Sequence, residues 1–344
     1  MDKDSAKFKR RIRYKGNHPR RFEEKYKELN SDKYASDVEK VIKSGKTPAG
    51  THRPVCVNEI LDILKLLPGE IGLDATLGFG GHALELLKKI IPKGRLFALD
   101  VDPIELERTQ RRLRAMGFDE KELVIKRSNF IGMSKLVTLT KGGFDFVLAD
   151  LGVSSMQLDN PARGFTFKHK GPLDLRFNPK RGQPAATLIK SLDEKQLKLL
   201  FIKNSDEPFA QWIARAVFRN RDKINTTTDL AKVVRSALSD KAYGSALTDS
   251  IRRTFQALRI EVNQEFSVLE KFLRNLPFCL KAGARVAILT FHSGEDSRVM
   301  NFFKQGFSCG VYERIGLNPI RSSAKEQYSN PRSKSAILRW AIKK

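Results

Sequence analysis

The stretch from Ile71 to Val101, IGLDATLGFGGHALELLKKIIPKGRLFALDV, predicts a strand, a glycine-rich turn, a helix and a second strand. The first apolar run ends at Asp74 and the second ends at Asp100, with helical periodicity over residues 82–91 between them. Two strands joined by a helix have to run parallel, because the crossover returns the chain to the same end of the sheet. This unit therefore commits the chain to an α/β fold more strongly than any other segment.

The same unit predicts a site for a nucleoside-containing cofactor. The helix that follows the turn presents unpaired N–H groups to the crevice beyond the strands. Asp100, at the tip of the second strand, can accept hydrogen bonds from both hydroxyls of a ribose. The motif Gly78-x-Gly80-x-x-Ala83 fits a dinucleotide, S-adenosylmethionine, or a turn that only packs a strand on a helix. It leaves the cofactor open.

The charge of the chain favours a polyanionic partner. The 344 residues include 64 Lys and Arg against 39 Asp and Glu, a net charge of +25. Such a field attracts nucleic acid. An anionic membrane is less favoured, because no lipidation signal or basic amphipathic segment with aromatic anchors stands out. We expect residues 1–50 to form a basic arm, either ordered on RNA or simply solvated.

The cysteines and the hydropathy pattern predict a cytoplasmic protein without a metal. Cys56, Cys279 and Cys309 are far apart and odd in number, so they form neither a disulfide framework nor a zinc-binding spacing. No apolar run approaches the roughly eighteen residues that cross a bilayer.

Beyond the organising unit, strands and helices alternate as far as the strand 144–150. More than a hundred residues then precede the next expected strand, 285–290, which is too long for one crossover helix. We therefore expect a Rossmann-like, doubly wound, parallel-rich sheet, formed by residues 51–157 and 252–344, with an inserted helical subdomain at 158–251. A long helix over about 261–281 would return the chain to the sheet, and the last alternating run would form an edge strand.

Two more strand ends should meet the glycine turn. The strand 144–150 ends in ADLGVSSMQLDNPARGFTF, and the strand near 290 ends in TFHSGED. In open parallel sheets ligands bind beyond the carboxyl ends of the strands, so Asp150 should face the same crevice as Gly80 and Asp100.

Seven segments carry a family resemblance: HRPVCVNEIL, LDATLGFGGH, ALDVDP, LADLGVSSMQLDNPARGFTF, GPLDLRFNP, RTFQALRIEVNQE and ILTFHSGED. In this order they resemble the bacterial methyltransferases that modify the N4 amino group of a cytidine in 16S rRNA, the small-subunit rRNA methyltransferase H family. The basic arm resembles the extended second form of this enzyme. The resemblance implies S-adenosylmethionine as cofactor and the decoding region of the small ribosomal subunit as substrate.

The family's site residues can be carried over one by one. The resemblance implies that the cofactor is bound by Gly80, Gly81, His82, Asp100, Phe130, Asp150 and Gln157. We further predict Asp150 as the group that orients the amino nitrogen, with Ser154 and Ser155 beside it and His292 as a candidate base. A carboxylate and a backbone carbonyl that accept the two N–H bonds would aim the nitrogen lone pair at the methyl group.

Two features leave part of the site open. DNA amino-methyltransferases usually stack the target base on the aromatic ring of an Asp/Ser-Pro-Pro-aromatic turn, whereas this chain has Asp150-Leu-Gly-Val. Gly294 stands where leucine is more usual in the family.

A set of basic residues after the Asp150 turn is expected to bind the RNA backbone: Arg163, Lys168, His169, Lys170, Arg176, Lys180 and Arg181.

Two other functions remain alternatives at this stage. A non-catalytic ribosome-assembly factor would keep the fold and the RNA binding, and a nicotinamide-dependent oxidoreductase would use the glycine turn. The sequence leaves open which cytidine is modified, and whether the substrate is naked RNA or an assembled subunit. It also leaves the oligomeric state open, with a homodimer as one option.

Overall fold

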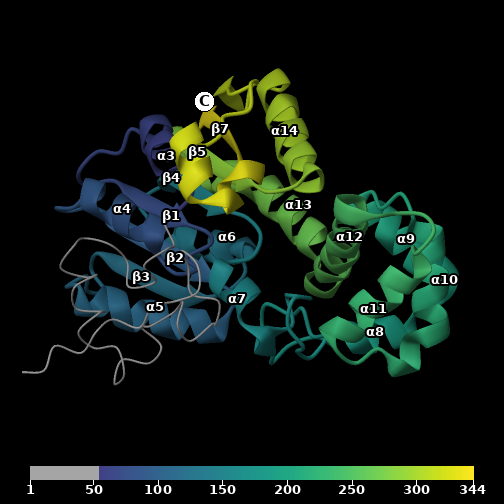
Figure 1. Cartoon of the computed structure of the whole chain (residues 1–344). Helices are drawn as coiled ribbons and strands as arrows, with labels where there is room; N and C mark the ends of the chain where they lie inside the picture. The colour runs from purple at the N-terminus through teal and green to yellow at the C-terminus, as the bar shows by residue number, and fades with distance from the viewer. Residues whose placement is uncertain (1–53) are drawn as a thin grey trace, which may run out of the picture. The chain divides into compact units, whose positions relative to one another are not determined.

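The computed structural model describes residues 54–344. The predicted basic arm lies outside the described residues. A seven-stranded sheet in the order β3-β2-β1-β4-β5-β7-β6 forms the centre of the described chain (Figure 1). Its strands are β1 Ile71–Asp74, β2 Arg95–Asp100, β3 Leu123–Arg127, β4 Phe144–Asp150, β5 Leu280–Thr290, β6 Tyr312–Ile315 and β7 Ile337–Lys343.

Strands β3, β2, β1, β4 and β5 are parallel, and only β7 and β6 add antiparallel pairs. The order reverses between β1 and β4, because the chain builds outward to β3 and then crosses back. This reversal is the switch point at which open α/β sheets bind ligands. The predicted parallel-rich, Rossmann-like sheet is confirmed by this topology.

Helices cover both faces of the sheet. One buried cluster joins the strands to Met133, Phe272 and Phe303, which come from α6, α13 and α14. The other joins them to residues of α3, α4 and α5, such as Leu64 and Leu87. The bounds of these helices are α3 Val57–Leu64, α4 Gly81–Ile90, α5 Pro103–Ala115, α6 Met133–Leu136, α13 Glu265–Asn275 and α14 Ser293–Ser308.

Short elements connect the strands and follow the sheet. The 3₁₀ turns are η2 Phe130–Gly132, η3 Val137–Leu139, η4 Pro161–Arg163, η6 Leu276–Cys279 and η7 Pro331–Ser335, and the short helices are α7 Ser155–Asp159 and α15 Ala324–Ser329. Of these, η2 and α7 directly follow the ends of β3 and β4.

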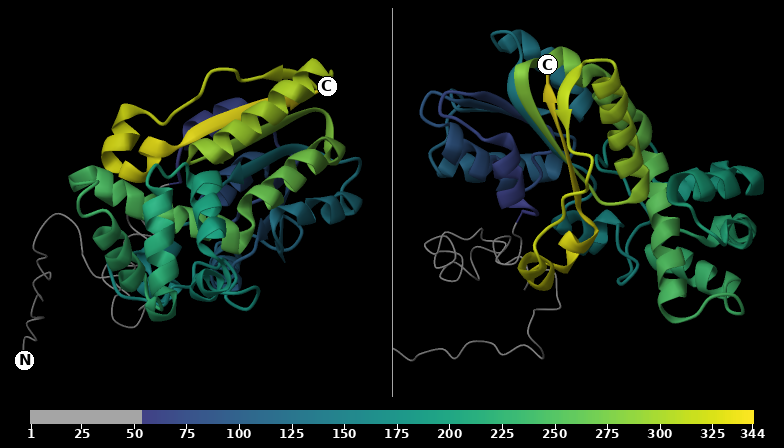
Figure 2. Two further views of the ribbon diagram at one scale, coloured as in Figure 1. Left: turned by 90° about the vertical axis from the view of Figure 1, so that its right-hand side faces the viewer. Right: turned by 90° about the horizontal axis from the view of Figure 1, so that it is seen from above.

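The segment between β4 and β5 builds a group of helices with its own core. It contains α8 Ala185–Ser191, α9 Glu194–Ser205, α10 Ala210–Asn220, η5 Arg221–Lys223, α11 Thr227–Ala237 and α12 Gly244–Asn263. Their apolar faces meet in a third buried cluster that contains no strand residue. Figures 1 and 2 show α8 to α11 beside the sheet-bearing part, with α12 leading from them to α13. The expected boundary at residue 251 falls inside α12.

Two local predictions need correction. The expected helix over 261–281 is divided, because Gln264 adopts a left-handed conformation with φ 53° and ends α12. Helix α13 follows and ends at Asn275, and η6 and the first residues of β5 complete the range. The last strand, β7, lies between β5 and β6, so β6 is the edge.

Among the described residues, no helix combines the length and the apolar character needed to span a bilayer.

Removing the Phe272 ring should destabilise the protein strongly, because this side chain is fully buried in the cluster that joins α13 to the sheet. We expect Phe272→Ala to lower the free energy of unfolding by about 3–5 kcal/mol, measured by denaturant unfolding. The matched control is Phe278→Ala, whose side chain is 85% exposed and should change stability by less than about 0.5 kcal/mol. Equal losses in the two variants would contradict this packing.

Candidate active site

Polar groups from the ends of β1 and β4 meet at the switch point. The Thr76 hydroxyl, just beyond β1, accepts the Asp150 backbone N–H at 2.6 Å. His82, in the first turn of α4, places Nε2 3.5 Å from Asp150 Oδ2. The structure therefore brings together β1, α4 and β4, three of the elements that carry the predicted site.

The glycine turn is held against β2 and α5. The Gly78 N–H donates to Asp100 Oδ2 at 2.6 Å, and the Thr109 hydroxyl donates to the Gly78 carbonyl at 2.7 Å. Gly80 has φ +71°, and a Cβ there would lie 2.9 Å from the Thr109 side chain. At Gly81 a Cβ would lie 2.9 Å from Pro54. A side chain at either position would therefore force Thr109 or Pro54 to shift.

The His82 imidazole and two carboxylates form a buried charge cluster. Burial lowers the pKa of His82, but the hydrogen bonding and charge of Asp150, with the charge of Asp74, outweigh burial, so the net pKa is raised. Burial raises the pKa of Asp74 to about 6, against the opposing charge of His82. The two carboxylates thus favour the protonated form of His82, whose charge is opposite to theirs.

Asp100 is fixed in the position expected of a ribose acceptor. Its Oδ1 accepts the Asp102 N–H at 2.8 Å, and its Oδ2 accepts that of Gly78. Each carboxylate oxygen keeps a further lone pair. Burial raises the pKa of Asp100 to about 6, partly offset by the N–H groups of Asp102 and Gly78.

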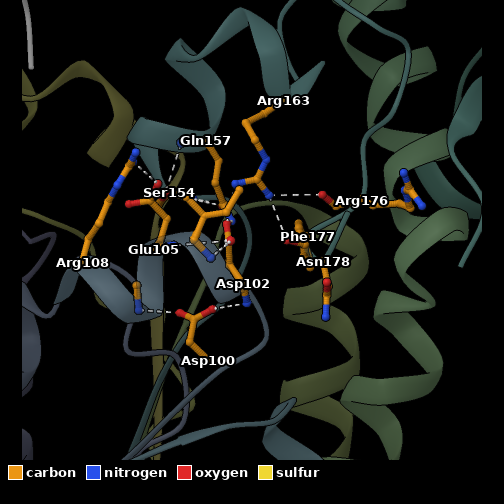
Figure 3. A network of polar contacts seen from close by, with 12 residues as sticks. Asp100, Asp102, Glu105, Arg108, Ser154, Gln157, Arg163, Arg176, Phe177 and Asn178 are labelled. Carbon is orange, nitrogen blue, oxygen red and sulfur yellow. Dashed lines mark hydrogen bonds and ion pairs between the residues drawn. The ribbon is translucent and has the colours of Figure 1, made fainter. Parts of the chain in front are cut away.

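Asp102 is the centre of a buried network that the sequence did not reveal (Figure 3). Its Oδ1 caps α5 by accepting the Ile104 N–H at 3.0 Å. Its Oδ2 accepts from Gln157 Nε2 at 2.8 Å and from Arg163 Nη1 at 2.6 Å. The sequence does indicate Asp102 as a helix N-cap, because an Asp directly before Pro103 is a typical N-cap pattern. Nothing in the sequence indicates its two distant donors, Gln157 and Arg163.

Helix α7 fixes the turn after Asp150. Ser154 and Gln157 form a capping box, in which the Ser154 hydroxyl accepts the Gln157 N–H and Gln157 Oε1 accepts the Ser154 N–H. The Ser154 hydroxyl can still donate its own proton, and Ser155 is the first residue of the helix. Gln157 is buried, with both ends of its amide engaged, so in this structure it positions the turn and Asp102.

Two members of the expected RNA-gripping set are engaged in the fold. Arg163 is buried, pairs with Asp102 and donates to the carbonyls of Arg176 and Phe177. Arg176 makes a bidentate pair with Asp174 at 2.6 and 2.8 Å. The prediction that these two arginines contact RNA is therefore corrected, because their donors are taken by protein groups. The other five residues of the set are exposed.

Phe130 lies in η2, just after β3. It is partly buried, and its ring meets Phe272 edge-on at a centroid distance of 5.1 Å. This packing explains an aromatic residue here without a ligand, and the expected contact with adenine stays a prediction.

His292 belongs to a separate cluster at the end of β5. Its Nε2 lies 3.2 Å from Glu295 Oε1, and its ring lies 5.9 Å from that of Phe266. Burial acts to raise the pKa of Glu295, but the hydrogen bond and charge of His292 and the charge of Arg259 lower it overall. Asp150 pairs in register with Leu289, so His292 stands three residues beyond that pair. Within the described chain, no hydrogen bond or ion pair joins His292 to Asp150 or His82.

Cys56, Glu59 and Glu326 offer ligand atoms within 4.8 Å of one another. Burial, together with the charge of Glu326, raises the pKa of the Cys56 thiol to about 12, and Glu326 already accepts the Cys56 N–H at 3.1 Å. Glu326 is therefore already engaged by the backbone of this segment, and we assign no metal to this group.

The residues present suit a cationic nucleoside. Asp74 Oδ2 and Asp150 Oδ1 are buried without a hydrogen-bond partner in the part of the chain that the structure describes. Unpartnered buried carboxylate oxygens require a donor or a positive charge. The ammonium group of S-adenosylmethionine would provide both for Asp74 Oδ2, next to the ribose acceptor Asp100, and would leave Asp150 Oδ1 for a second donor.

A Rossmann-like sheet with acidic strand ends and a glycine turn at its switch point defines an α/β protein that binds a nucleoside-containing cofactor. Residues 49–344 match the MraW methylase family, and the chain belongs to that family. This membership confirms the predicted methyltransferase activity and its donor, S-adenosylmethionine. It does not favour an oxidoreductase or a non-catalytic assembly factor.

Curated relatives match either the whole chain or all but its first part, as expected for the extended form with an N-terminal arm. "Ribosomal RNA small subunit methyltransferase H 2" of Alkaliphilus metalliredigens is 52% identical over 100% of both chains. "Ribosomal RNA small subunit methyltransferase H 1" of Lachnoclostridium phytofermentans is 50% identical over 97% of this chain and 93% of its own. "Ribosomal RNA small subunit methyltransferase H" of Carboxydothermus hydrogenoformans is 38% identical, over 85% of this chain but 98% of its own.

Breaking the Asp102–Arg163 pair should destabilise the fold, because it leaves an uncompensated charge in a buried position. We expect Arg163→Leu to lower the free energy of unfolding by about 3–5 kcal/mol. The double variant Asp102→Leu/Arg163→Leu should lose clearly less than the sum of the two single variants, because no lone charge remains. The control is Arg111→Leu, which removes an exposed pair with Glu107 and should cost at most about 1 kcal/mol.

Cofactor affinity should fall as the pH decreases through about 6. The Asp100 carboxyl of the free protein has a pKa of about 6, and only its ionised form can accept from both ribose hydroxyls. Binding therefore releases a proton below this pH, so affinity should drop by up to about ten-fold per pH unit. Calorimetric titration with S-adenosylhomocysteine at a series of pH values measures this slope. Asp100→Asn should bind weakly throughout with a shallower slope, and a flat wild-type profile would refute the assignment.

Proposed function

We propose that the protein transfers a methyl group from S-adenosylmethionine to the N4 amino group of a cytidine in small-subunit ribosomal RNA. The observation that carries this proposal is Asp150, whose Oδ1 is buried without a partner at the end of β4 while His82 and Thr76 fix the rest of the residue. The names of the relatives and the basic charge of the chain support RNA as the substrate.

Asp150 addresses the main obstacle of this reaction. The lone pair of the cytosine amino nitrogen is delocalised into the ring, which makes the nitrogen a weak nucleophile. If Asp150 Oδ1 accepts one N–H bond and a backbone carbonyl of the following turn accepts the other, the nitrogen becomes pyramidal and its lone pair is aimed. S-adenosylmethionine would supply the electrophilic methyl group, with an N–C bond formed as its S–C bond breaks. Asp150 Oδ1 would then take the proton that the methylated nitrogen loses.

The other predicted site residues receive supporting roles in this proposal. Asp100 would hold the ribose, Gly80 and Gly81 would let the backbone approach the methionine end, and Phe130 would border the adenine. The Ser154–Gln157 capping box and the Ser155 backbone would keep the turn after Asp150 in place. His292, paired with Glu295, is the weaker candidate for the base, because its ring engages a different cluster.

The helices at residues 158–251 form the proposed substrate-recognition subdomain. They have their own buried core, and exposed cations such as Lys168, Lys170 and Lys180 lie between the Asp150 turn and α8. Since the proposed substrate is the small ribosomal subunit, the proposal places the enzyme in the cytoplasm. It requires no second copy of the chain, so a homodimer stays an untested option.

Replacing Asp150 should abolish methyl transfer without unfolding the chain. We expect Asp150→Ala to lower kcat by about 10²–10³-fold, measured with labelled S-adenosylmethionine and small subunits from cells that lack the enzyme. Nucleoside mass spectrometry of the recovered rRNA would identify N4-methylcytidine. Asp145→Ala is the matched control, because this carboxylate of the same strand pairs with Lys281 and should leave kcat within about two-fold. Wild-type activity in Asp150→Ala would remove this residue from the site.

A further inference from the structure

A basic groove lies in the helical insertion, in a part of the chain distinct from the methyl-transfer site. It is lined by α10, η5 and α11, and its volume is about 590 Å³. None of the residues placed at the ends of β1, β2, β4 or β5 lines it. Neither the proposed chemistry nor the buried core of the insertion accounts for this groove.

The charged residues of the groove are predominantly positive. Arg215, Arg219, Lys223 and Lys232 line it, whereas Asp229 is its one acidic lining residue in the described chain. The Asp229 carboxylate is already used, since it accepts the Thr226 N–H at 2.9 Å as part of a capping box. The groove therefore offers an unbalanced positive field, which is the requirement for holding phosphate groups.

Three of the four cations have free charged groups. Arg215 lies 3.5 Å from Glu194. Arg219, Lys223 and Lys232 are exposed and make no ion pair with any described acidic residue. Arg215 and Arg219 follow each other by one helical turn, about 6 Å along the axis of α10, and Lys223 continues the row in η5. A row of this kind can follow the backbone of one extended strand.

An exposed aromatic ring stands at the end of this row. Trp212 lines the groove and is 47% exposed, although indole rings are usually largely buried. It lies outside the buried cluster of the insertion. Phe209 supports it at a centroid distance of 6.1 Å, and the Lys241 amine lies over the ring, 5.4 Å from its centroid. A supported and exposed indole beside a row of cations is the combination on which unpaired bases stack.

We propose that the groove between α10 and α11 binds an unpaired segment of RNA, with phosphates along Arg215, Arg219, Lys223 and Lys232 and one base on Trp212. This inference deepens the proposed function, because the segment would belong to the same RNA that carries the target cytidine. A duplex cannot offer a free base face to Trp212, so the geometry selects single-stranded RNA. The groove would thus hold the substrate at a second point on the helical insertion.

The two tryptophans of the chain provide a local test. In a Trp340→Phe variant, Trp212 is the sole tryptophan, and a short oligouridylate should quench its fluorescence on binding. In a Trp212→Phe variant, which retains Trp340, the same titration should give no quenching. A matched RNA duplex should quench Trp212 far less. Unchanged Trp212 fluorescence at saturating oligouridylate, or equal quenching by polyglutamate, would overturn the proposal.

Affinity measurements on charge variants complete the test in the full chain. We expect Trp212→Ala to weaken oligouridylate binding about ten-fold. The single variant Lys232→Glu should also weaken it, and the double variant Arg219→Glu/Lys232→Glu should weaken it more and flatten its salt dependence. Arg235→Glu is the matched control, because Arg235 is exposed on α11 but does not line the groove. An equal loss in Arg235→Glu and Lys232→Glu would show that only the general charge matters, which would reject the groove.

The methylation assay separates this inference from the proposed function. Groove variants should raise the KM for small subunits several-fold at an unchanged kcat, whereas Trp212→Ala and wild type should bind S-adenosylhomocysteine equally. If the wild type transfers no methyl group to small subunits, the proposed function fails, and the fluorescence titration still decides the groove. If KM is unchanged in Trp212→Ala and in the double charge variant, the groove does not bind the substrate.

Discussion

The buried carboxylate of Asp102 is the contact on which the arrangement of the site depends. It caps α5 immediately after β2, and it receives Gln157 from α7 and Arg163 from η4. Arg163 in turn donates to the carbonyl of Phe177, whose N–H donates to Asn263 at the end of α12. One chain of hydrogen bonds therefore runs from the end of β2, through the turn after β4, to the last residue of α12.

This series of hydrogen bonds explains why charged side chains occupy buried positions where apolar side chains would give a similar or higher stability. A buried ion pair seldom adds net stability over a well-packed apolar pair, because both charges lose their hydration. Hydrogen bonds, however, fix direction as well as distance. The network sets the positions of Asp100, which Asp102 contacts through its N–H, and of the turn that carries Ser154. We attribute its charged character to this geometric demand.

The sequence predicted the elements whose signals are local. Apolar runs ending in Asp74, Asp100 and Asp150 indicated the strands and their polar tips, because the periodicity of each run is visible within it. The partners of Asp102 could not be found in this way, since Gln157 and Arg163 lie 55 and 61 positions away. The alternating pattern of β7 suggested an edge strand, but its neighbours on both sides are set by tertiary pairing, and β6 took the edge. Arg163 and Arg176 were predicted to contact RNA, because a sequence gives the charge of a side chain but neither its exposure nor its partners in the fold.

The long separation between β4 and β5 also affects the order in which the protein folds. These strands are neighbours in the sheet, yet 129 residues intervene between Asp150 and Leu280 (280 − 150 − 1 = 129), and the helices among them complete a hydrophobic core of their own. Contacts between residues close in sequence form quickly, while pairing across long loops is slow. During synthesis the helices can pack while β4 is already paired with β1 and still lacks β5. The separate core of the insertion can therefore be complete before the last parallel strand closes the sheet.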